Sequence, residues 1–460
     1  MFKTSPHTSK LVNPPRIIML STSFIAACVI GLVVALLTVL FVGLVIRAET
    51  WRVDATANFD RFSITLFLCQ TSLLSAGMII LVMLRRLLNI SRWHGPADVI
   101  HAAHTNMSLL SIKTGIATIL SVLVSVIAGA SVGIYGPLVH FGAFLSKILN
   151  SIFRATLLSH DMLIGCGVAA AISAGFNAPI AGMIFAHEVV LRHFSMRALA
   201  PIAIASIASF SVSSWLFEDI RWLRLDISVP SILSLSPGLL ISGLFFGIIS
   251  VLIIRLQIKV SKWAVRSALK DWELGGIAVI ICALLGFLVP EALGLGPATI
   301  RGMLSLEFGL GTLLIFLISK IILTAASTCL GYSLGIFSPS LFIGAAAGGV
   351  AGSILNLAGL PISLPIFMVC GMAALSGAVT GAPIAVMVII IEMTMSYDLA
   401  VATMIAVGTC SFISFIFGGS SLFDQQLQMR NINITGGRVA LLLAEMPIND
   451  LANENYSIIP

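Results

Sequence analysis

The sequence predicts an all-α integral membrane protein with a duplicated membrane domain, and three observations lead to this prediction. Of the 460 residues, 58% are hydrophobic and only 10% are charged, whereas a soluble domain carries about 25% charged residues. Charge-free runs exceed the ~20 residues that a helix needs to cross a bilayer, notably at 17–46, 62–84 and 114–146. Similar blocks of sequence also occur in both halves of the chain.

Polar segments flank the membrane domain. Residues 1–16 are polar and basic, and the apolar run that follows is too long for the core of a signal peptide. Because basic segments stay on the cytoplasmic side, we expect 1–16 to be a cytoplasmic N-terminal segment. Residues 17–430 form the membrane domain. Residues 431–460 read as a cytoplasmic C-terminal segment, either a truncated regulatory domain or a vestige of one. A bacterial inner membrane is the expected location.

The membrane domain contains an internal repeat. Three pairs of blocks occur in the same order, 202 or 204 residues apart: SVGIYGPLVHFGA (131–143) with SLGIFSPSLFIGA (333–345), CGVAA (166–170) with CGMAA (370–374), and NAPIAGMIFAHE (177–188) with GAPIAVMVIIIE (381–392). They define two halves, at about 60–215 and about 265–417. Repeats of this kind in membrane proteins commonly enclose a transport path built from broken helices.

The first repeated block interrupts an apolar run with helix-breaking residues. Gly133 and Gly136 permit backbone conformations that other residues resist, and Pro137 suits the first turn of a helix. Irregular backbone at membrane depth survives only inside protein or beside a cavity. We therefore expect a helix to begin there, and another to begin at the matching block. The free amides would face a cavity: Ile134, Tyr135 and Gly136 in one motif, Ile336, Phe337 and Ser338 in the other. Gly133 and Gly335 are expected to line the same anion path.

Two converging helix N-termini make a site for an anion. Each carries roughly half a positive charge, and the amides donate hydrogen bonds to a bound ion. They offset the large cost of burying an ion without a fixed Lys or Arg that would hold it too tightly for conduction. A cation site would need inward-facing oxygen atoms instead.

The motifs together resemble the CLC family of chloride channels and chloride/proton antiporters, over residues ~60–425. The resemblance rests on GIYGPLVHFGA (133–143), SAGFNAPIAGMIFAHE (173–188), GIFSPSLFIG (335–344) and SGAVTGAPIAVMVIIIEMT (376–394). It implies the CLC-type fold: about eighteen membrane helices in two inverted-topology repeats, with broken helices that meet at the midplane. It also implies a homodimer with one pore per subunit, and chloride or another small anion as substrate.

The chain departs from this family at the gate. The family's usual first motif is G-[KR]-E-G-P, in which the glutamate is the gate and the proton carrier. Here the motif is Gly133-Ile134-Tyr135-Gly136-Pro137, so Tyr135 occupies the gate position. A phenol has a pKa near 10, so it stays neutral at neutral pH and shuttles no protons. It can donate a hydrogen bond to an anion, or block the path as an uncharged plug.

Three other pathway positions also differ. The second, internal glutamate of the antiporters falls on Val189, and the pore tyrosine of the family falls on Phe423. The pore serine falls near Trp93, although His94 or Gly95 could occupy that position instead. With two hydroxyls lost, the path could favour larger, less hydrated anions such as nitrate or thiocyanate over chloride.

These departures lead to the main hypothesis: passive, proton-uncoupled movement of small anions. One alternative is an antiporter with an unorthodox proton carrier such as His187. Another is a non-conducting sensor or scaffold whose pore Tyr135 and Trp93 plug. The apolar helices carry no Ser–His, paired-Asp, HExxH or nucleotide-loop motif, so we expect no enzyme activity and no cofactor. The seven cysteines form no CxxC pair, and nothing suggests a metal. The expected partners are the bilayer, a second subunit and the anion, with no nucleic acid.

Four polar residues in apolar sequence need an interpretation of their own. Glu188 and Glu392 hold matching places in the two halves, and this symmetry favours a structural role in which each caps or pairs with buried groups. For His140 we expect a packing role. Arg192 ends the segment that carries Glu188, where a cation suits the negative end of a helix.

Overall fold

A computed structural model describes residues 16–57, 59–60, 62–105, 110–153, 158–216, 231–360 and 362–432. The expected cytoplasmic segments at 1–16 and 431–460 lie almost wholly outside the described residues. Within these ranges the chain is helical, without a β-strand, which confirms the all-α fold class. Eight of the described helices are long and apolar enough to cross a membrane, by length and composition. The chain is therefore a multi-pass membrane protein.

The helices of the first half precede residue 217. They are α1 (Arg16–Ala57), α2 (Ile64–Leu87), α3 (Pro96–His104), α4 (Ile112–Ala128), α5 (Tyr135–Phe153), α6 (His160–Phe176), α7 (Pro179–Phe185), the π-helix η2 (Ala186–Leu191) and α8 (Met196–Leu216). Those after residue 230 are α9 (Ile232–Arg266), α10 (Asp271–Leu288), the short 3-10 helix η3 (Pro290–Ala292), α11 (Pro297–Leu304), α12 (Leu310–Cys329), α13 (Phe337–Leu357), α14 (Leu364–Thr380), α15 (Pro383–Thr394), α16 (Tyr397–Gly418) and α17 (Leu422–Gln428).

Local sequence explains where these helices begin and end. The hydroxyls of Ser63, Ser111, Ser396 and Ser421 accept hydrogen bonds from the first turns of α2, α4, α16 and α17, as N-cap serines do. The charge-free run at 114–146 is divided because Gly129, with φ 87°, ends α4 in the left-handed conformation that glycine adopts at low cost. An irregular segment then leads to α5.

The two halves reuse the same helix pairs. α5 packs on α6 in the first half, and α13 packs on α14 in the second. Both crossings depend on facing glycines: a Cβ on Gly142 would lie 2.2 Å from the carbonyl oxygen of Gly167, and one on Gly344 would lie 2.4 Å from that of Gly371. The matched close approaches show that the repeat in the sequence is a repeat in packing.

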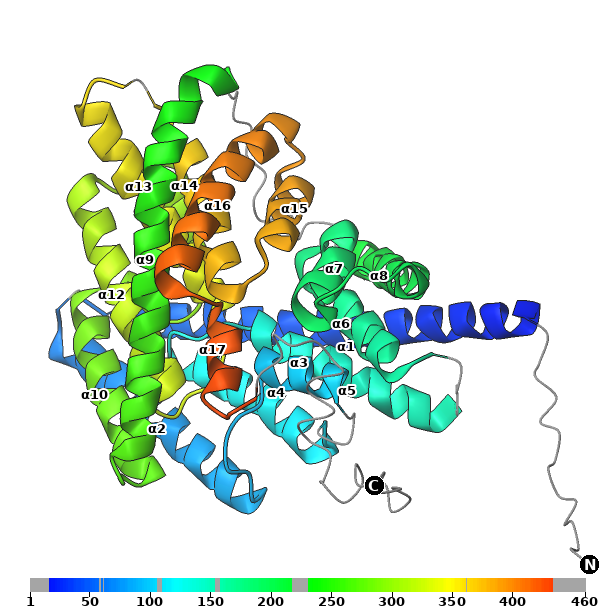
Figure 1. The fold of residues 1–460 in the computed structure, drawn as a ribbon. Coiled ribbons are helices and arrows are strands. Elements are labelled where there is room, and N and C mark those ends of the chain that lie inside the picture. Colours follow the sequence, from blue (N-terminus) through cyan, green and yellow to red (C-terminus); the bar gives the residue numbers. More distant parts are fainter. Residues whose placement is uncertain are drawn as a thin grey trace, which may run out of the picture.

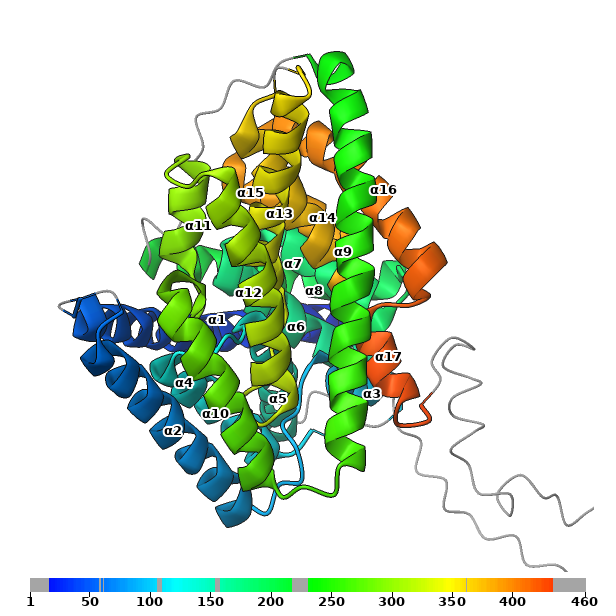
Figure 2. The same ribbon diagram turned by 90° about the vertical axis from the view of Figure 1, so that its left-hand side faces the viewer.

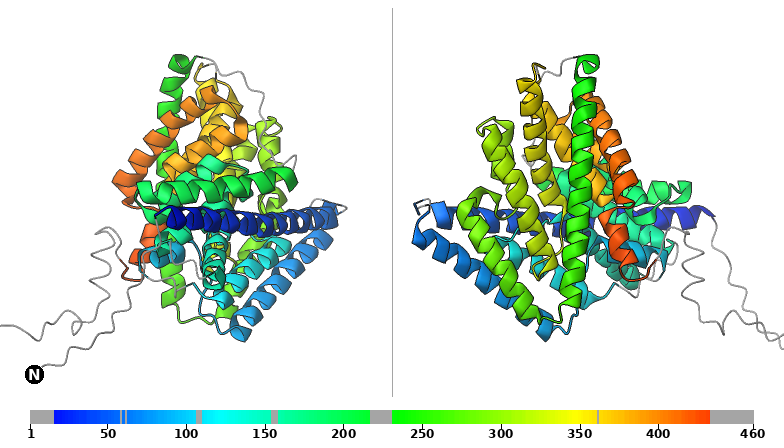
Figure 3. Two further views of the ribbon diagram at one scale, coloured as in Figure 1. Left: turned by 90° about the vertical axis from the view of Figure 1, so that its right-hand side faces the viewer. Right: turned by 60° about the vertical axis from the view of Figure 1, so that its left-hand side comes forward.

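The halves meet along α7 and α15, which pack together at the centre of the view in Figure 1. The long helix α9 runs beside α12, α14 and α16 in the second half, and Figure 2 shows it along one side of the molecule. α1 crosses the direction of α9, as both views in Figure 3 show. Residues 133–137 and 335–339, where the sequence motifs break the apolar runs, are buried inside the protein.

Candidate functional site

The two glycine-rich breaks touch each other. The amide of Gly133 donates a hydrogen bond to the carbonyl oxygen of Gly335 over 2.8 Å. A Cβ on Gly335 would lie 2.0 Å from the carbonyl oxygen of Gly133, so only glycine permits this approach. Residues 133–137 and 335–339, which are 202 residues apart in sequence, thus form one structural unit.

From this unit α5 and α13 begin. α5 starts at Tyr135 and α13 at Phe337, and their first turns are closed by the amides of Leu138 and Ser340. The amides before these positions have no partner inside a helix, because the first turn always leaves them free. Both helices are about twenty residues long, so each brings a positive end to the same place.

A narrow cavity opens onto these helix ends from the side of α17. It has room for about 50 Å³ and will be called the α17-side cavity. Gly95 and Pro96 at the start of α3, and Phe423 of α17, form part of its wall. The broken helices contribute Tyr135, Gly136, Gly335, Ile336 and Phe337.

A second cavity lies on the other side of Tyr135, next to α1. It measures about 260 Å³ and will be called the α1-side cavity. Ile134 and Ser338 of the two breaks line it, together with Arg301. The Ser338 hydroxyl is buried without a hydrogen-bond partner among the described residues, so it is available as a donor. Tyr135 belongs to the walls of both cavities and stands between them.

Three aromatic side chains pack together at Tyr135, and we call them the aromatic cluster. The ring of Tyr135 stacks on that of Phe176, with centroids 3.6 Å apart and planes 14° apart. Phe337 meets both rings edge-on, at centroid distances of 5.6 Å and 5.3 Å. The Tyr135 hydroxyl donates to the Gly175 carbonyl oxygen at 3.4 Å, a long hydrogen bond. Tyr135 is therefore held in aromatic packing at the walls of both cavities.

The α17-side cavity also has polar side chains that the sequence motifs did not reveal. Gln257 and Ser261 of α9 and Thr328 and Cys329 of α12 line it. The Gln257 side-chain oxygen accepts from Thr328 at 2.9 Å and from the Cys329 thiol at 2.8 Å. These contacts use the oxygen of the Gln257 side chain, and its amide nitrogen carries two further N–H donors. In the sequence, the only signal was a pair of polar residues one turn apart in α9.

The remaining pathway positions lie farther from the cavities. Trp93 is buried, and its indole N–H donates to the Gly331 carbonyl oxygen at 3.1 Å. It is Gly95, two residues later, that reaches the wall of the α17-side cavity, because it is the N-cap of α3. Val189 is a buried apolar residue of η2 and lines neither cavity.

A charged cluster forms part of the wall of the α17-side cavity. Asp98 lines this cavity together with Arg430. Its carboxylate accepts from Arg92 at 3.0 Å, from Arg430 at 2.8 Å and from the amide of Gly95 at 2.9 Å. Two guanidinium groups on one carboxylate leave a net positive charge at this wall, which attracts anions.

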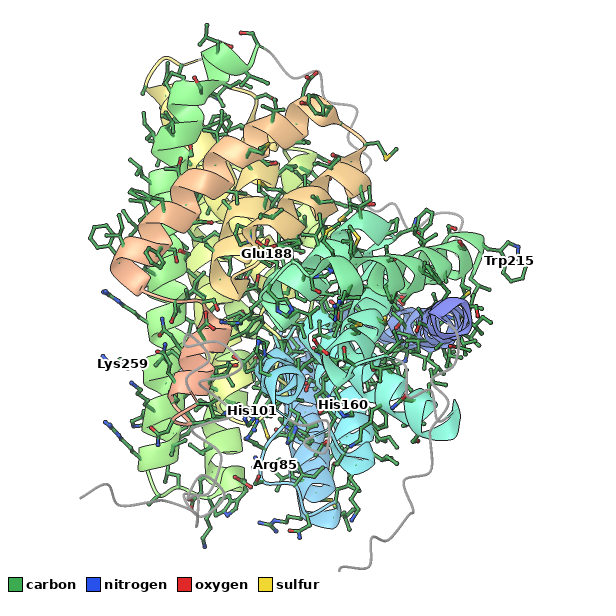
Figure 4. The ribbon with its side chains drawn as sticks, turned by 45° about the vertical axis from the view of Figure 1, so that its right-hand side comes forward. Arg85, His101, His160, Glu188, Trp215 and Lys259 are labelled. Carbon is green, nitrogen blue, oxygen red and sulfur yellow. The ribbon has the colours of Figure 1, made fainter. Side chains whose placement is uncertain are left out.

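The two intramembrane acids contact backbone amides in a symmetric way. Glu188 accepts from the amides of Ile384 and Ala385 at 2.9 and 2.7 Å. Glu392 accepts from those of Ile180 and Ala181 at 2.9 and 2.8 Å. Figure 4 shows Glu188 in the interior, where the halves meet. Each carboxylate thus lies on the first-turn amides of a helix from the other half.

The three other singled-out residues are engaged in packing or pairing. His187 contacts the His193 carbonyl oxygen through Nδ1 at 3.1 Å and stacks on Phe194. His140 packs edge-on against His94, and its ring nitrogens bond to none of the described residues. Arg192 forms an ion pair with Asp424 at the start of α17. No group of three or more potential metal ligands exists among the residues that the structure describes.

Comparison with known proteins identifies the family. A family model described as voltage gated chloride channel matches residues 76–414, which is most of the chain. The chain belongs to this family. It is 30% identical over 344 residues, 72% of this chain and 79% of the relative, to a putative chloride channel protein ClcB-like of Ralstonia nicotianae. It is 29% identical over 318 residues to the H(+)/Cl(-) exchange transporter ClcA of Klebsiella pneumoniae, covering 65% of this chain and 66% of that transporter.

Solved structures show the same fold. A slow cyanobacterial Cl-/H+ antiporter superposes with a TM-score of 0.77 at 19% identity, covering 89% of this chain and 98% of the other. A eukaryotic CLC transporter gives a TM-score of 0.75 at 21% identity, with coverage of 90% and 75%. This CLC protein therefore shares its architecture with transporters of low sequence identity, and its own function depends on its pathway residues.

Proposed function

We propose that this CLC protein moves chloride or similar small anions passively across the membrane, without coupling to protons. The observation that carries the proposal is the meeting of the α5 and α13 N-termini between two cavities. Free amides at helix N-termini bind anions. Among the described residues, the only acid in the walls of these cavities is Asp98, and two arginines neutralise it.

The second part of the proposal concerns protons. Coupled exchange needs a group that gains a proton in one state and loses it in another. Tyr135 and Val189 occupy the positions where the resemblance places the two proton-carrying glutamates, and neither titrates near neutral pH. The anion then moves down its own gradient and the membrane potential, which contributes ~2.3 kcal/mol per charge per 100 mV.

Several relatives are named as proton/chloride exchangers, so an exchanger with a substitute carrier is the second candidate. His187 was the residue suggested for this role. It is stacked on Phe194, is bonded to the backbone at His193 and lines neither cavity. The position of His187 therefore does not favour a role as a substitute proton carrier. The third candidate, a silent scaffold, would require the aromatic cluster never to open.

Paired flux measurements test the proposal. Purified protein is reconstituted in chloride-loaded liposomes, and chloride efflux is started with a potassium ionophore while external pH is recorded. Chloride efflux without proton uptake is the expected result. Proton movement against its gradient, in fixed ratio to chloride, overturns the proposal in favour of exchange. The absence of chloride, nitrate and thiocyanate flux overturns it in favour of the scaffold.

Assembly and orientation follow as further proposals from the same resemblance. We infer a homodimer in a bacterial inner membrane with both termini in the cytoplasm. An ion pair between Arg85 and Asp271, at 3.4 Å, joins the end of α2 to the start of α10. The basic end of α9 immediately precedes α10 in the chain, so basic residues gather at one end of these helices. Basic residues favour the cytoplasmic side.

A further inference from the structure

The last third of α9 carries a row of basic side chains on its outer surface, which we call the basic face. Figure 4 shows Lys259 on the outer side of α9, pointing away from the helix bundle. Spacings of three and four residues keep side chains on one side of a helix. The members have these spacings, and all are exposed: Arg255, Lys259, Lys262 and Arg266.

The basic face lacks the acidic partners that nearby arginines have. Arg85, Arg192 and Arg430 are paired with Asp271, Asp424 and Asp98. By contrast, none of the four members of the basic face forms an ion pair with a described residue; Arg255 donates to the carbonyl oxygen of Phe417 at 2.7 Å. The face therefore presents four uncompensated charges.

These side chains line an open hollow on the surface of α9. A cavity of about 630 Å³ is lined by all four members of the basic face. The rest of its described wall consists of Ile258, Trp263, Ser267 and Gln425, with no acidic residue. An anionic group that enters the hollow would meet donors from two turns or more of one helix, which is the setting in which phosphate oxygens bind.

The same side of α9 becomes apolar toward the middle of the helix. Ile248 is 63% exposed and Leu252 is 54% exposed, and they lie seven and three residues before Arg255, on the same side. Trp263, at the border of the hollow, is 47% exposed. Tryptophan is enriched where membrane meets water. An exposed apolar surface that leads into a basic hollow matches a lipid, whose acyl chains join a charged headgroup.

We propose that the basic face binds the phosphate headgroup of an anionic phospholipid, whose acyl chains lie along Ile248 and Leu252. Basic clusters at the end of a membrane helix attract anionic lipids by roughly fivefold in affinity per side chain. A phosphate from solution would match the charges alone, whereas the adjoining apolar surface commits the site to a lipid. The proposal is independent of the transport mechanism, because these residues line neither cavity beside Tyr135.

Quenching of Trp263 fluorescence by brominated lipids tests the proposal on the intact chain. The protein is reconstituted in equimolar phosphatidylcholine and phosphatidylglycerol. In each series one of the two lipids is replaced stepwise by its form with brominated acyl chains, so that only the mole fraction of the brominated lipid changes. The signal of a W263F variant is subtracted to isolate Trp263. Brominated phosphatidylglycerol is expected to quench at a lower mole fraction than brominated phosphatidylcholine. Equal quenching by the two lipids overturns the proposal.

Charge variants make the test specific. K259Q/K262Q removes two charges from the basic face and is expected to lower the preference for phosphatidylglycerol about thirtyfold. K113Q/R197Q removes two exposed charges from α4 and α8 and is expected to leave it unchanged. The site is overturned if K259Q/K262Q and K113Q/R197Q lose the preference for phosphatidylglycerol equally. It is also overturned if K259Q/K262Q keeps the full preference. If inorganic phosphate abolishes the quenching by brominated phosphatidylglycerol, the site binds phosphate from solution and the proposed lipid is wrong. Circular dichroism confirms that each variant is folded.

Discussion

Glu188 and Glu392 hold the two halves of the protein together by capping each other's helices. Glu188, from the first half, accepts from the first turn of α15, and Glu392, from the second half, accepts from the first turn of α7. Each carboxylate thereby satisfies two amides that a helix start leaves free and lies at the positive end of a dipole. The intramembrane acids are thus fully used in structure.

Replacing either acid with glutamine should therefore lower the free energy of unfolding. It should not change the proton flux that accompanies chloride. E188Q keeps one acceptor and loses the charge, so we expect the free energy of unfolding to fall by about 1–3 kcal/mol. E392Q should cost a similar amount, because its contacts are equivalent. Thermal unfolding in detergent measures both. An unchanged melting temperature together with altered proton flux would place the acids in transport instead.

Tyr135 should act as a barrier through its ring rather than its hydroxyl. Y135A removes the partner of Phe176 in the aromatic cluster and joins the two cavities, so chloride flux should rise, by about tenfold if the barrier falls by ~1.4 kcal/mol. Y135F keeps the stacked ring and loses only the 3.4 Å hydrogen bond. Its flux should match that of the natural protein. Loss of flux in Y135F would show that the hydroxyl binds the anion.

The pH dependence of flux should appear only when an acid is introduced. The natural protein, with Tyr135 neutral, should give the same chloride flux from about pH 5 to pH 8. In Y135E the carboxylate forms as pH rises through its ordinary pKa of about 4.3, and the negative charge then competes with the anion. Flux through Y135E should fall as pH rises from about 3 to about 5.5 and stay low at higher pH. A pH-dependent flux in the natural protein would reveal a titrating group in the path.

Gln257 should supply a side-chain donor in a path that has lost hydroxyls. Q257L removes the amide and should weaken chloride binding about tenfold, the equivalent of one hydrogen bond to a charged group. Q257E keeps the acceptor for Thr328 and Cys329 and replaces the donors with a negative charge, so it should bind chloride even more weakly. Calorimetric titration measures both. Unchanged affinity in the two variants would remove Gln257 from the site.

The sequence predicted those parts of the site that depend on local backbone rules. Gly133 and Pro137 favour a helix start through local backbone rules that do not depend on tertiary contacts. The acids at matching positions of the repeat predict matching contacts. Gln257 reaches the α17-side cavity, and Phe176 reaches the ring of Tyr135, through packing between distant helices, which periodicity does not encode. The position of Trp93 shows the same limit: the motif alignment is uncertain by two residues, and only the N-cap geometry of Gly95 selects the residue at the wall.

The glycine crossings should be the positions most sensitive to a single added methyl group. In G142A the new Cβ would lie 2.2 Å from the carbonyl oxygen of Gly167, which is backbone and cannot move aside without separating α5 from α6. We expect a loss of at least ~3 kcal/mol, at the upper end of the range for overpacked sites, and little folded protein.

G408A is the matched control. Gly408 lies inside α16, and no atom of the described residues beyond its own helix lies within 4 Å of the place that an added methyl group would occupy. Alanine favours a helix over glycine by about 1 kcal/mol, so this variant should be as stable as the natural protein or slightly more so. Gel filtration and thermal unfolding of the two variants compare them directly. If G142A melted at the temperature of G408A, then α5 and α6 would not be in the close contact from which the α5 N-terminus takes its position beside α13.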